Sequence, residues 1–126
     1  YFSGSYGSRL GEEVAVLDLN DDGFDDIAAA SAREGAVYLV FGKGTWPAST
    51  NVYGAMTGAN GFVIGGLSSL PNIRSPRIDL NGDGRDDLVF RHRPVPMDGT
   101  TWRLGVLFGA VGPWAASFDP LTIDGT

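Results

Sequence analysis

Short apolar runs alternate along the chain with clusters of turn-forming residues. The runs are four to seven residues long, partly β-branched or aromatic, and bounded by Gly, Pro, Asn and Asp, a pattern typical of strands rather than helices. The Ala28-Ala29-Ala30 triplet lies too close to the turn at residues 33–35 to favour a helix. The pattern therefore predicts an all-β protein, with strands near 13–18, 26–31, 35–41, 60–65, 75–79, 87–91, 101–108 and 119–123.

The second half of this pattern repeats the first. The sequence Asp-Leu-Asn-x-Asp-Gly-x-Asp-Asp occurs at residues 18–26, here the first acidic loop, and again at 79–87, the second acidic loop. Each copy lies between two apolar runs, and each half later reaches a Phe-Gly pair, at 41–42 and 108–109. Such self-similarity indicates a repeat architecture. We expect two units, residues 1–66 and 67–126, each with four antiparallel strands and with the acidic loop joining the first two.

The spacing of oxygen-bearing residues in both loops is that of a calcium site. Side-chain oxygens at positions 1, 3 and 5, glycine at 6 and a backbone carbonyl at 7 can surround a hard cation, and magnesium prefers fewer protein ligands. Position 12, where an EF-hand carries glutamate, is Ala29 or Phe90, so the aspartate at position 9 closes the loop. We predict two Ca²⁺ ions, held by Asp18, Asn20, Asp22, the carbonyl of Phe24 and Asp26, and by Asp79, Asn81, Asp83, the carbonyl of Arg85 and Asp87.

A second interpretation of these loops stays open, because Asp, Asn and Gly are also common in turns that bind no ion. Two matched copies favour the metal interpretation. The acids at even positions, Asp21, Asp25 and Asp86, are expected to be solvated or to accept hydrogen bonds from loop amides.

Composition excludes several other functions. With 9 basic and 15 acidic side chains and a net charge of −6, the chain lacks the basic balance of a nucleic-acid binder. It contains no cysteine and one histidine, which excludes disulfides and thiolate sites and leaves little for zinc or copper. The longest apolar run, residues 36–41, is far shorter than the roughly 20 residues of a membrane span, so we expect no membrane insertion.

The repeated motif, with the Gly-Ala-Val-Tyr-Leu-Val-Phe-Gly segment at residues 35–42, resembles the FG-GAP repeat of integrin-α-type β-propellers and of bacterial surface proteins. The resemblance covers residues 5–66 and about 70–124. It implies that each unit is one four-stranded propeller blade, with a structural, non-catalytic Ca²⁺ in the loop between its first two strands. The Gly-Ala-Pro that often follows the second strand in this family is replaced by residues 30–32 in the first unit and 91–94 in the second.

Two blades are too few for a closed propeller, which has about 4–8. The chain can be part of a longer propeller, it can close into a ring with further copies, or copies can stack into an open filament. Terminal strands can also pair with a neighbouring chain. We therefore expect self-association or further blades, and a free monomer is the least expected outcome.

Signs of catalysis are weak. No Gly-x-Ser-x-Gly elbow is present, and His92 lies among Arg91, Arg93 and Pro94, where we expect an exposed loop running from 91 to 101. We predict a non-enzymatic, calcium-stabilised structural or adhesion module, with a glycan or a surface protein as its ligand. An extracellular location is expected because extracellular modules bind calcium at roughly 10⁻⁴–10⁻³ M.

The alternative function is a carbohydrate-binding module that uses Trp102 and the 91–101 loop. Trp46 and Trp114 occupy equivalent places in the two units, which favours a packing role for both. Trp102 has no such equivalent and is the better candidate for a contact with a ligand. Arg91, Arg93 and Arg103 either meet an acidic partner or belong to a solvated loop.

Overall fold

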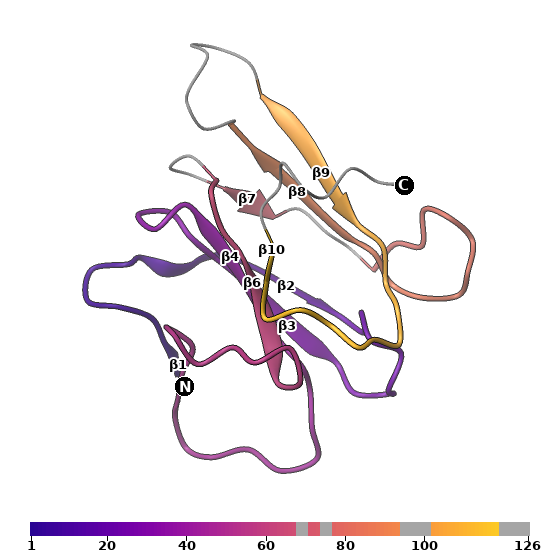
Figure 1. Ribbon diagram of the computed structural model, residues 1–126, viewed down its shortest axis with the longest axis horizontal. Helices are drawn as coiled ribbons and strands as arrows, with labels where there is room; N and C mark the ends of the chain where they lie inside the picture. Colours follow the sequence, from indigo (N-terminus) through magenta and orange to yellow (C-terminus); the bar gives the residue numbers. More distant parts are fainter. Residues whose placement is uncertain (68–70, 74–76, 94–101, 119–126) are drawn as a thin grey trace.

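The protein is built entirely from strands and turns in the part of the chain that its computed structural model describes, which is residues 1–67, 71–73, 77–93 and 102–118. Ten strands form three sheets (Figure 1). None of the described residues belongs to a helix that could cross a membrane. The all-β prediction is therefore confirmed.

The largest sheet has five strands in the order β10-β6-β4-β3-β2. Its strands β2, β3, β4 and β6 pair antiparallel, and Ala29 of β3 lies opposite Tyr38 of β4. The fifth strand, β10, comes from the second half of the chain and runs parallel to β6. The strands are β2 (Leu10–Leu17), β3 (Asp26–Ser31), β4 (Ala36–Val40), β6 (Gly61–Ile64) and β10 (Ser117–Phe118).

A three-stranded antiparallel sheet lies against the five-stranded sheet (Figure 1). It contains β7 (Asn72–Ile73), β8 (Leu88–His92) and β9 (Arg103–Leu107), with β8 in the centre. A small parallel pair, β1 (Phe2–Ser3) and β5 (Thr50–Asn51), forms the third sheet.

Six of the predicted strands are confirmed and correspond to β2, β3, β4, β6, β8 and β9. The strand expected at 75–79 is wrong for its described part, 77–79, which is not a strand. Its place beside β8 is taken by β7, whose residues Asn72 and Ile73 lie opposite Arg91 and Phe90. The strand expected at 119–123 lies outside the described residues, as does most of the 91–101 loop.

Four strands in each unit are not confirmed. β10 adds a fifth strand to β2, β3, β4 and β6, and the second sheet has three strands among the described residues. The difference arises where the chain leaves the second unit and returns to the first. Trp114 stacks on Phe62 at 5.1 Å between ring centroids, and Phe118 meets the same ring edge-on at 5.1 Å. Aromatic pairs in these geometries are favourable beyond the area they bury. They hold β10 on the free edge of β6.

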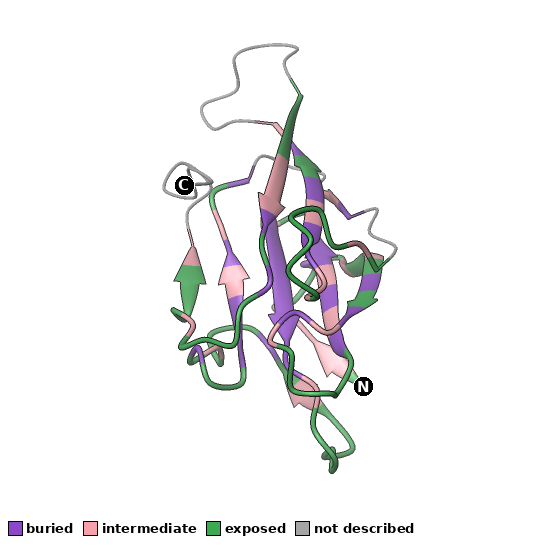
Figure 2. Cartoon of the chain, turned by 90° about the vertical axis from the view of Figure 1, so that its right-hand side faces the viewer, coloured by how far each residue is buried: buried purple, intermediate pink, exposed green. Residues whose placement is uncertain are grey.

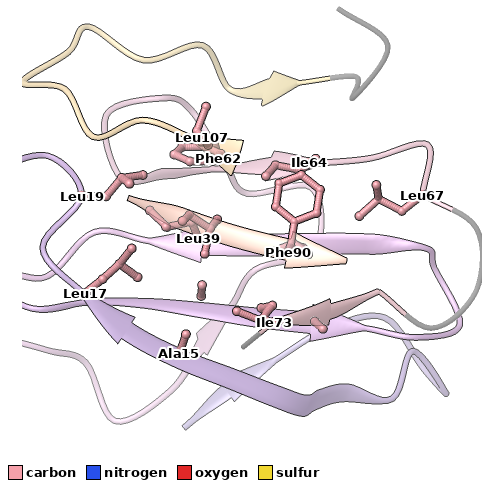
Figure 3. Close-up of a cluster of buried hydrophobic side chains, with 14 of the residues drawn as sticks. Ala15, Leu17, Leu19, Leu39, Phe62, Ile64, Leu67, Ile73, Phe90 and Leu107 are labelled. Carbon is pink, nitrogen blue, oxygen red and sulfur yellow. The ribbon is translucent and has the colours of Figure 1, made fainter. Parts of the chain in front are cut away.

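The main hydrophobic core lies between the five-stranded and three-stranded sheets (Figure 3). Small side chains on β3, Ala28 and Ala30, are buried there and leave room for the larger residues of the facing sheet. Burying one leucine or phenylalanine side chain contributes about 1.5–3 kcal/mol. The core side chains are Ala15, Leu17, Leu19, Ala28, Ala30, Val37, Leu39, Phe41, Phe62, Ile64, Leu67, Ile73, Leu88, Phe90 and Leu107.

The opposite face of the five-stranded sheet is covered as well. Tyr38 and Val40 of β4 pack with Val52, and Phe2 and Met56 lie against this second cluster. The strands in the middle of the molecule are consequently buried on both faces, while exposed residues gather in the loops (Figure 2). By contrast, the three-stranded sheet presents Val89, Arg91, Leu104 and Val106, its outer face, away from the core.

Candidate metal-binding loops

The two acidic loops lie side by side at the same end of the two large sheets (Figure 1). The backbone N–H of Asp18 donates a hydrogen bond to Oδ2 of Asp86 across 2.8 Å. At the next residue of the first loop, the carbonyl of Leu19 accepts a hydrogen bond from the N–H of Ala110 at 3.0 Å. These contacts fix the first loop against the second unit.

The aspartate at position 9 of each loop forms the same pair of hydrogen bonds in both units. Asp26 is fully buried, and its two carboxylate oxygens each accept from a backbone N–H at 2.8 Å, one from Leu19 and one from Gly42. Asp87, also fully buried, accepts from Leu80 at 2.7 Å and from Gly109 at 2.9 Å. Each carboxylate therefore ties the start of its loop to the Phe-Gly pair at the end of a later strand.

The glycine of each Phe-Gly pair is explained by how closely it approaches the loop. A Cβ placed on Gly42 would lie 2.2 Å from the carbonyl oxygen of Asp25, and one on Gly109 would lie 2.4 Å from that of Asp86. Real Cβ atoms do not come this close to backbone oxygens. Only glycine allows the amide at this position to reach the buried aspartate.

Within the first loop, carboxylates bind the loop's own backbone. Asp18 accepts from the N–H of Asp22 at 3.2 Å and from that of Gly23 at 3.0 Å. Asp22 accepts from the N–H of Phe24 at 2.9 Å, and its second oxygen accepts from Nδ2 of Asn20 at 3.0 Å. These bonds curl residues 18–24 into a compact turn in which the side chains at positions 3 and 5 contact each other.

The second loop repeats this arrangement closely. Asp79 accepts from the N–H groups of Gly82 and Gly84, each at 2.7 Å. Asp83 accepts from the N–H of Arg85 at 2.9 Å and from Nδ2 of Asn81 at 3.2 Å. Two sequences 61 residues apart thus produce one local hydrogen-bonding pattern.

The donor set of the loops suits a hard cation, since it consists of carboxylate, amide and carbonyl oxygens. In the first loop, Oδ1 of Asn20 is buried and has no hydrogen-bond partner. A buried acceptor without a partner is rare and requires an explanation, and an ion at this position would supply one. In the described parts of the chain, however, no three Asp, Glu or His side chains come close enough together to hold a metal, because the aspartates are turned onto backbone amides.

The acids at even positions are engaged in different ways. Asp86 accepts a hydrogen bond from the backbone N–H of Asp18, as expected. Asp25 instead forms an ion pair with Arg77, and Oδ2 of Asp21 lies 3.5 Å from Nε of Arg85. Because both arginines belong to the second unit, these pairs join the two loops. Nothing in the spacing of the sequence pointed to Arg77 and Arg85 as partners of the first loop.

The environment changes the acidity of two loop carboxyls. Burial raises the pKa of Asp26, and the amides of Gly42 and Leu19 offset part of this effect. The pKa of Asp83 is lowered, chiefly because the backbone N–H of Arg85 donates to the ionised form. The side chain of Arg85 adds to the lowering and lies beside this carboxylate, with Nη1 3.5 Å from Oδ2.

Two expectations for other residues need correction. His92 is not an exposed loop residue. It ends β8 in phase with Leu88 and Phe90, so its ring is buried, 5.7 Å from the ring of Phe90. Trp114 packs on the main core as expected, but Trp46 is half-exposed and contacts Phe2 and Lys43 on the far side of the five-stranded sheet.

Comparison with known proteins finds a family match in the first unit, over the strands that flank the first acidic loop. The family model of the FG-GAP repeat matches residues 10–40, which comprise β2, the first acidic loop, β3 and β4. Integrin alpha-4 of Xenopus laevis is 38% identical over 92 residues, which cover 67% of this chain and 8% of that protein. The chain thus spans less than a tenth of this curated relative. No solved structure matches it.

Proposed function

Because residues 10–40 are an FG-GAP repeat, we propose that the chain is a non-catalytic, calcium-stabilised adhesion module of the β-propeller type that works outside the cell. The observation that carries this proposal is the acidic loop itself. It occurs twice, with the same carboxylate-to-amide bonds in each copy, and it brings a buried amide oxygen without a partner into the first copy.

The proposed ligands are those that the sequence predicts. Asp18, Asn20, Asp22 and the carbonyl of Phe24 would surround one Ca²⁺, with Asp26 beneath it. Asp79, Asn81, Asp83, the carbonyl of Arg85 and Asp87 would do the same for a second ion. The ion would neutralise carboxylates that otherwise repel one another, so its role is to stiffen the blade. The division of the chain into blades at residues 1–66 and 67–126 is part of this proposal.

The two sites are proposed to differ in affinity. The first loop carries aspartate at position 4, whereas the second carries Gly82 there. Arg85 lies 3.5 Å from a carboxylate of each loop, Asp21 in the first and Asp83 in the second, so the proposed difference rests on the added negative charge at position 4, which favours a cation. The first loop should therefore bind calcium more tightly than the second.

We also propose that the three-stranded sheet associates with a further blade at its end next to the acidic loops, from a second copy or from a longer propeller. Leu80 and Phe108 support this proposal, since they are 50% and 39% exposed. Their equivalents in the first unit, Leu19 and Phe41, are 0% and 7% exposed under the neighbouring sheet. Light scattering in millimolar Ca²⁺ and then in excess chelator tests this association, and a monomer under both conditions would contradict it.

Calcium titration by calorimetry tests the metal proposal. The wild-type chain should bind two ions, and Asp22→Ala and Asp83→Ala should each bind one, because each variant loses a ligand from an exposed loop. Asp25→Asn is the matched control, since position 8 is not a proposed ligand. At free calcium of 100 times Kd, one occupied site should raise the free energy of unfolding by about 2.7 kcal/mol. Two ions bound by either alanine variant would disprove the ligand assignment.

A further inference from the structure

The end of the outer face farthest from the acidic loops carries a cluster of arginines around a tryptophan. Cζ of Arg91 lies 4.2 Å from the centroid of the Trp102 ring, and Cζ of Arg93 lies 4.5 Å from it. Leu104 lies opposite Arg91 in the β8-β9 pairing and is 70% exposed. These four residues are here named the arginine clamp.

Stacking on an aromatic ring prepares a guanidinium group to bind an anion. The ring attracts the cation and fixes its plane, while the N–H groups at the edge of the plane remain able to donate. An arginine held in this way loses less side-chain entropy when it forms a bidentate bond with a carboxylate. Both Arg91 and Arg93 are held by one ring, so the clamp offers two oriented cations.

Neither arginine of the clamp has an acidic partner in the described part of the chain. Arg9, Arg77 and Arg85, in contrast, each pair with an acid. Nε of Arg93 is buried and lacks any hydrogen-bond partner. A buried donor left unpaired is costly. Because Nε is covered, a carboxylate from another molecule would pair with the guanidinium through its two Nη groups.

An apolar hollow adjoins the clamp. It has a volume of about 150 Å³ and is lined by Asn72, Val89, Phe90, Arg91 and Leu104. An apolar cavity of about 150 Å³ is large enough to take up benzene, so one leucine- or valine-sized side chain fits. Beside the hollow, β9 has no strand on its far side among the described residues. Such an edge can pair with an extended segment of another protein.

We propose that the arginine clamp binds a carboxylate side chain of an extended peptide segment from a partner protein, with a neighbouring apolar side chain of that segment in the hollow. A peptide fits better than a glycan for two reasons. An apolar hollow and an unpaired strand edge favour an apolar side chain and a peptide backbone over the hydroxyl groups of a sugar. In addition, guanidinium groups occupy the faces of the Trp102 ring on which a sugar would stack. This site lies away from the acidic loops and does not depend on the proposed calcium.

Fluorescence anisotropy with a labelled peptide tests the proposal. The probe alternates glutamate with leucine and threonine, and its control replaces each glutamate by glutamine. The glutamate peptide should bind at least about tenfold more tightly than the glutamine peptide, since charge-assisted bonds to arginine distinguish the two. Arg91→Gln and Arg93→Gln should each weaken binding by about tenfold, and Arg33→Gln, an exposed arginine elsewhere, should not.

Trp102→Phe tests the stacking, because a smaller ring holds the guanidinium groups less firmly and should weaken binding of the same peptide. Each variant should retain the wild-type Tm and calcium stoichiometry, which separates a failure of this proposal from a failure of the calcium sites. Equal binding of the glutamate and glutamine peptides would overturn the proposal. So would binding of heparin, but not of the glutamate peptide, through Arg91 and Arg93, since the site would then recognise a sulfated glycan.

Discussion

The two acidic loops are nearly identical in their internal bonds and very different in what surrounds them. Asp26 and Asp87 each accept hydrogen bonds from two backbone amides, and the glycine of a Phe-Gly pair approaches each loop. Yet Leu19 in the first loop is fully buried, whereas Leu80, at the same position of the second, is half-exposed.

This difference shows that the sequence of a loop determines its hydrogen bonds but not its burial. The hydrogen bonds of the loop are set within nine residues and one later Phe-Gly pair, so every copy of the motif reproduces them. Burial depends on the next unit along the chain. The first loop lies against the second unit, while no described residue lies in the equivalent place beyond the second loop. Substitutions at equivalent positions of the two loops therefore measure the contribution of the hydrogen bonds and the contribution of burial separately.

The largest effect is expected when the buried aspartate is removed. Asp26→Ala and Asp87→Ala should each lower the free energy of unfolding by about 4 kcal/mol, because two buried N–H groups lose their acceptor and each costs about 1–3 kcal/mol. The losses should be similar, since the bonds are local to each unit. Urea denaturation followed by circular dichroism, with chelator present, measures them without a contribution from metal. A loss below about 1 kcal/mol at either position would show that the hydrogen bonds from this aspartate to the two backbone amides are not needed for stability.

A smaller and asymmetric effect is expected for the leucines at position 2. Leu19→Ala should cost about 3 kcal/mol, as is usual for a buried leucine, whereas Leu80→Ala should change the free energy of unfolding by less than about 0.5 kcal/mol. Thermal and urea unfolding of both variants at low protein concentration give the comparison. Equal losses would mean that Leu80 is covered in solution.

The smallest effect concerns a contact found in the first unit. Glu34 accepts hydrogen bonds from the hydroxyls of Ser5 and Tyr38 and so joins the N-terminal segment to β4. Burial raises the pKa of Glu34, but bonds from Ser5, Ser31 and Tyr38 outweigh this effect and lower it. The ionised carboxylate is thus favoured in the folded state. Its contribution is complete above the pKa of the unfolded chain and is lost as the pH falls through the lowered folded value.

Glu34→Gln should accordingly cost about 1 kcal/mol at neutral pH, and this cost should shrink in acid. Urea midpoints measured from pH 7 down to pH 3 give the profile. Glu12→Gln is the control, because its partner Arg9 lies on the surface and exposed pairs contribute little. A difference between wild type and Glu34→Gln that stays constant down to pH 3 would contradict the assigned direction of the pKa shift.

The sequence was informative where structure is local and less so where it depends on distant segments. Short apolar runs between turn residues located six strands, and the repeated motif located both acidic loops, while the assignment of their calcium ligands stays a prediction. The β10-β6 pairing could not be predicted from period or propensity, because Phe62, Trp114 and Phe118 are brought together by the overall path of the chain. The prediction that His92 is an exposed loop residue is wrong for a related reason. Its arginine neighbours suggest a loop, but the alternation of Leu88 and Phe90 carries it into the core.

The return of the chain to β6 also bears on the order of folding. Residues 63 and 64 pair with 117 and 118, so the five-stranded sheet keeps an open edge until the later part of the chain has been synthesised. Pairings between residues so far apart in sequence form late, since the entropy of closing the intervening segment is lost before the contact is gained. The second unit must therefore reach its position before the five-stranded sheet is complete, and we expect the two units to unfold in a single cooperative transition.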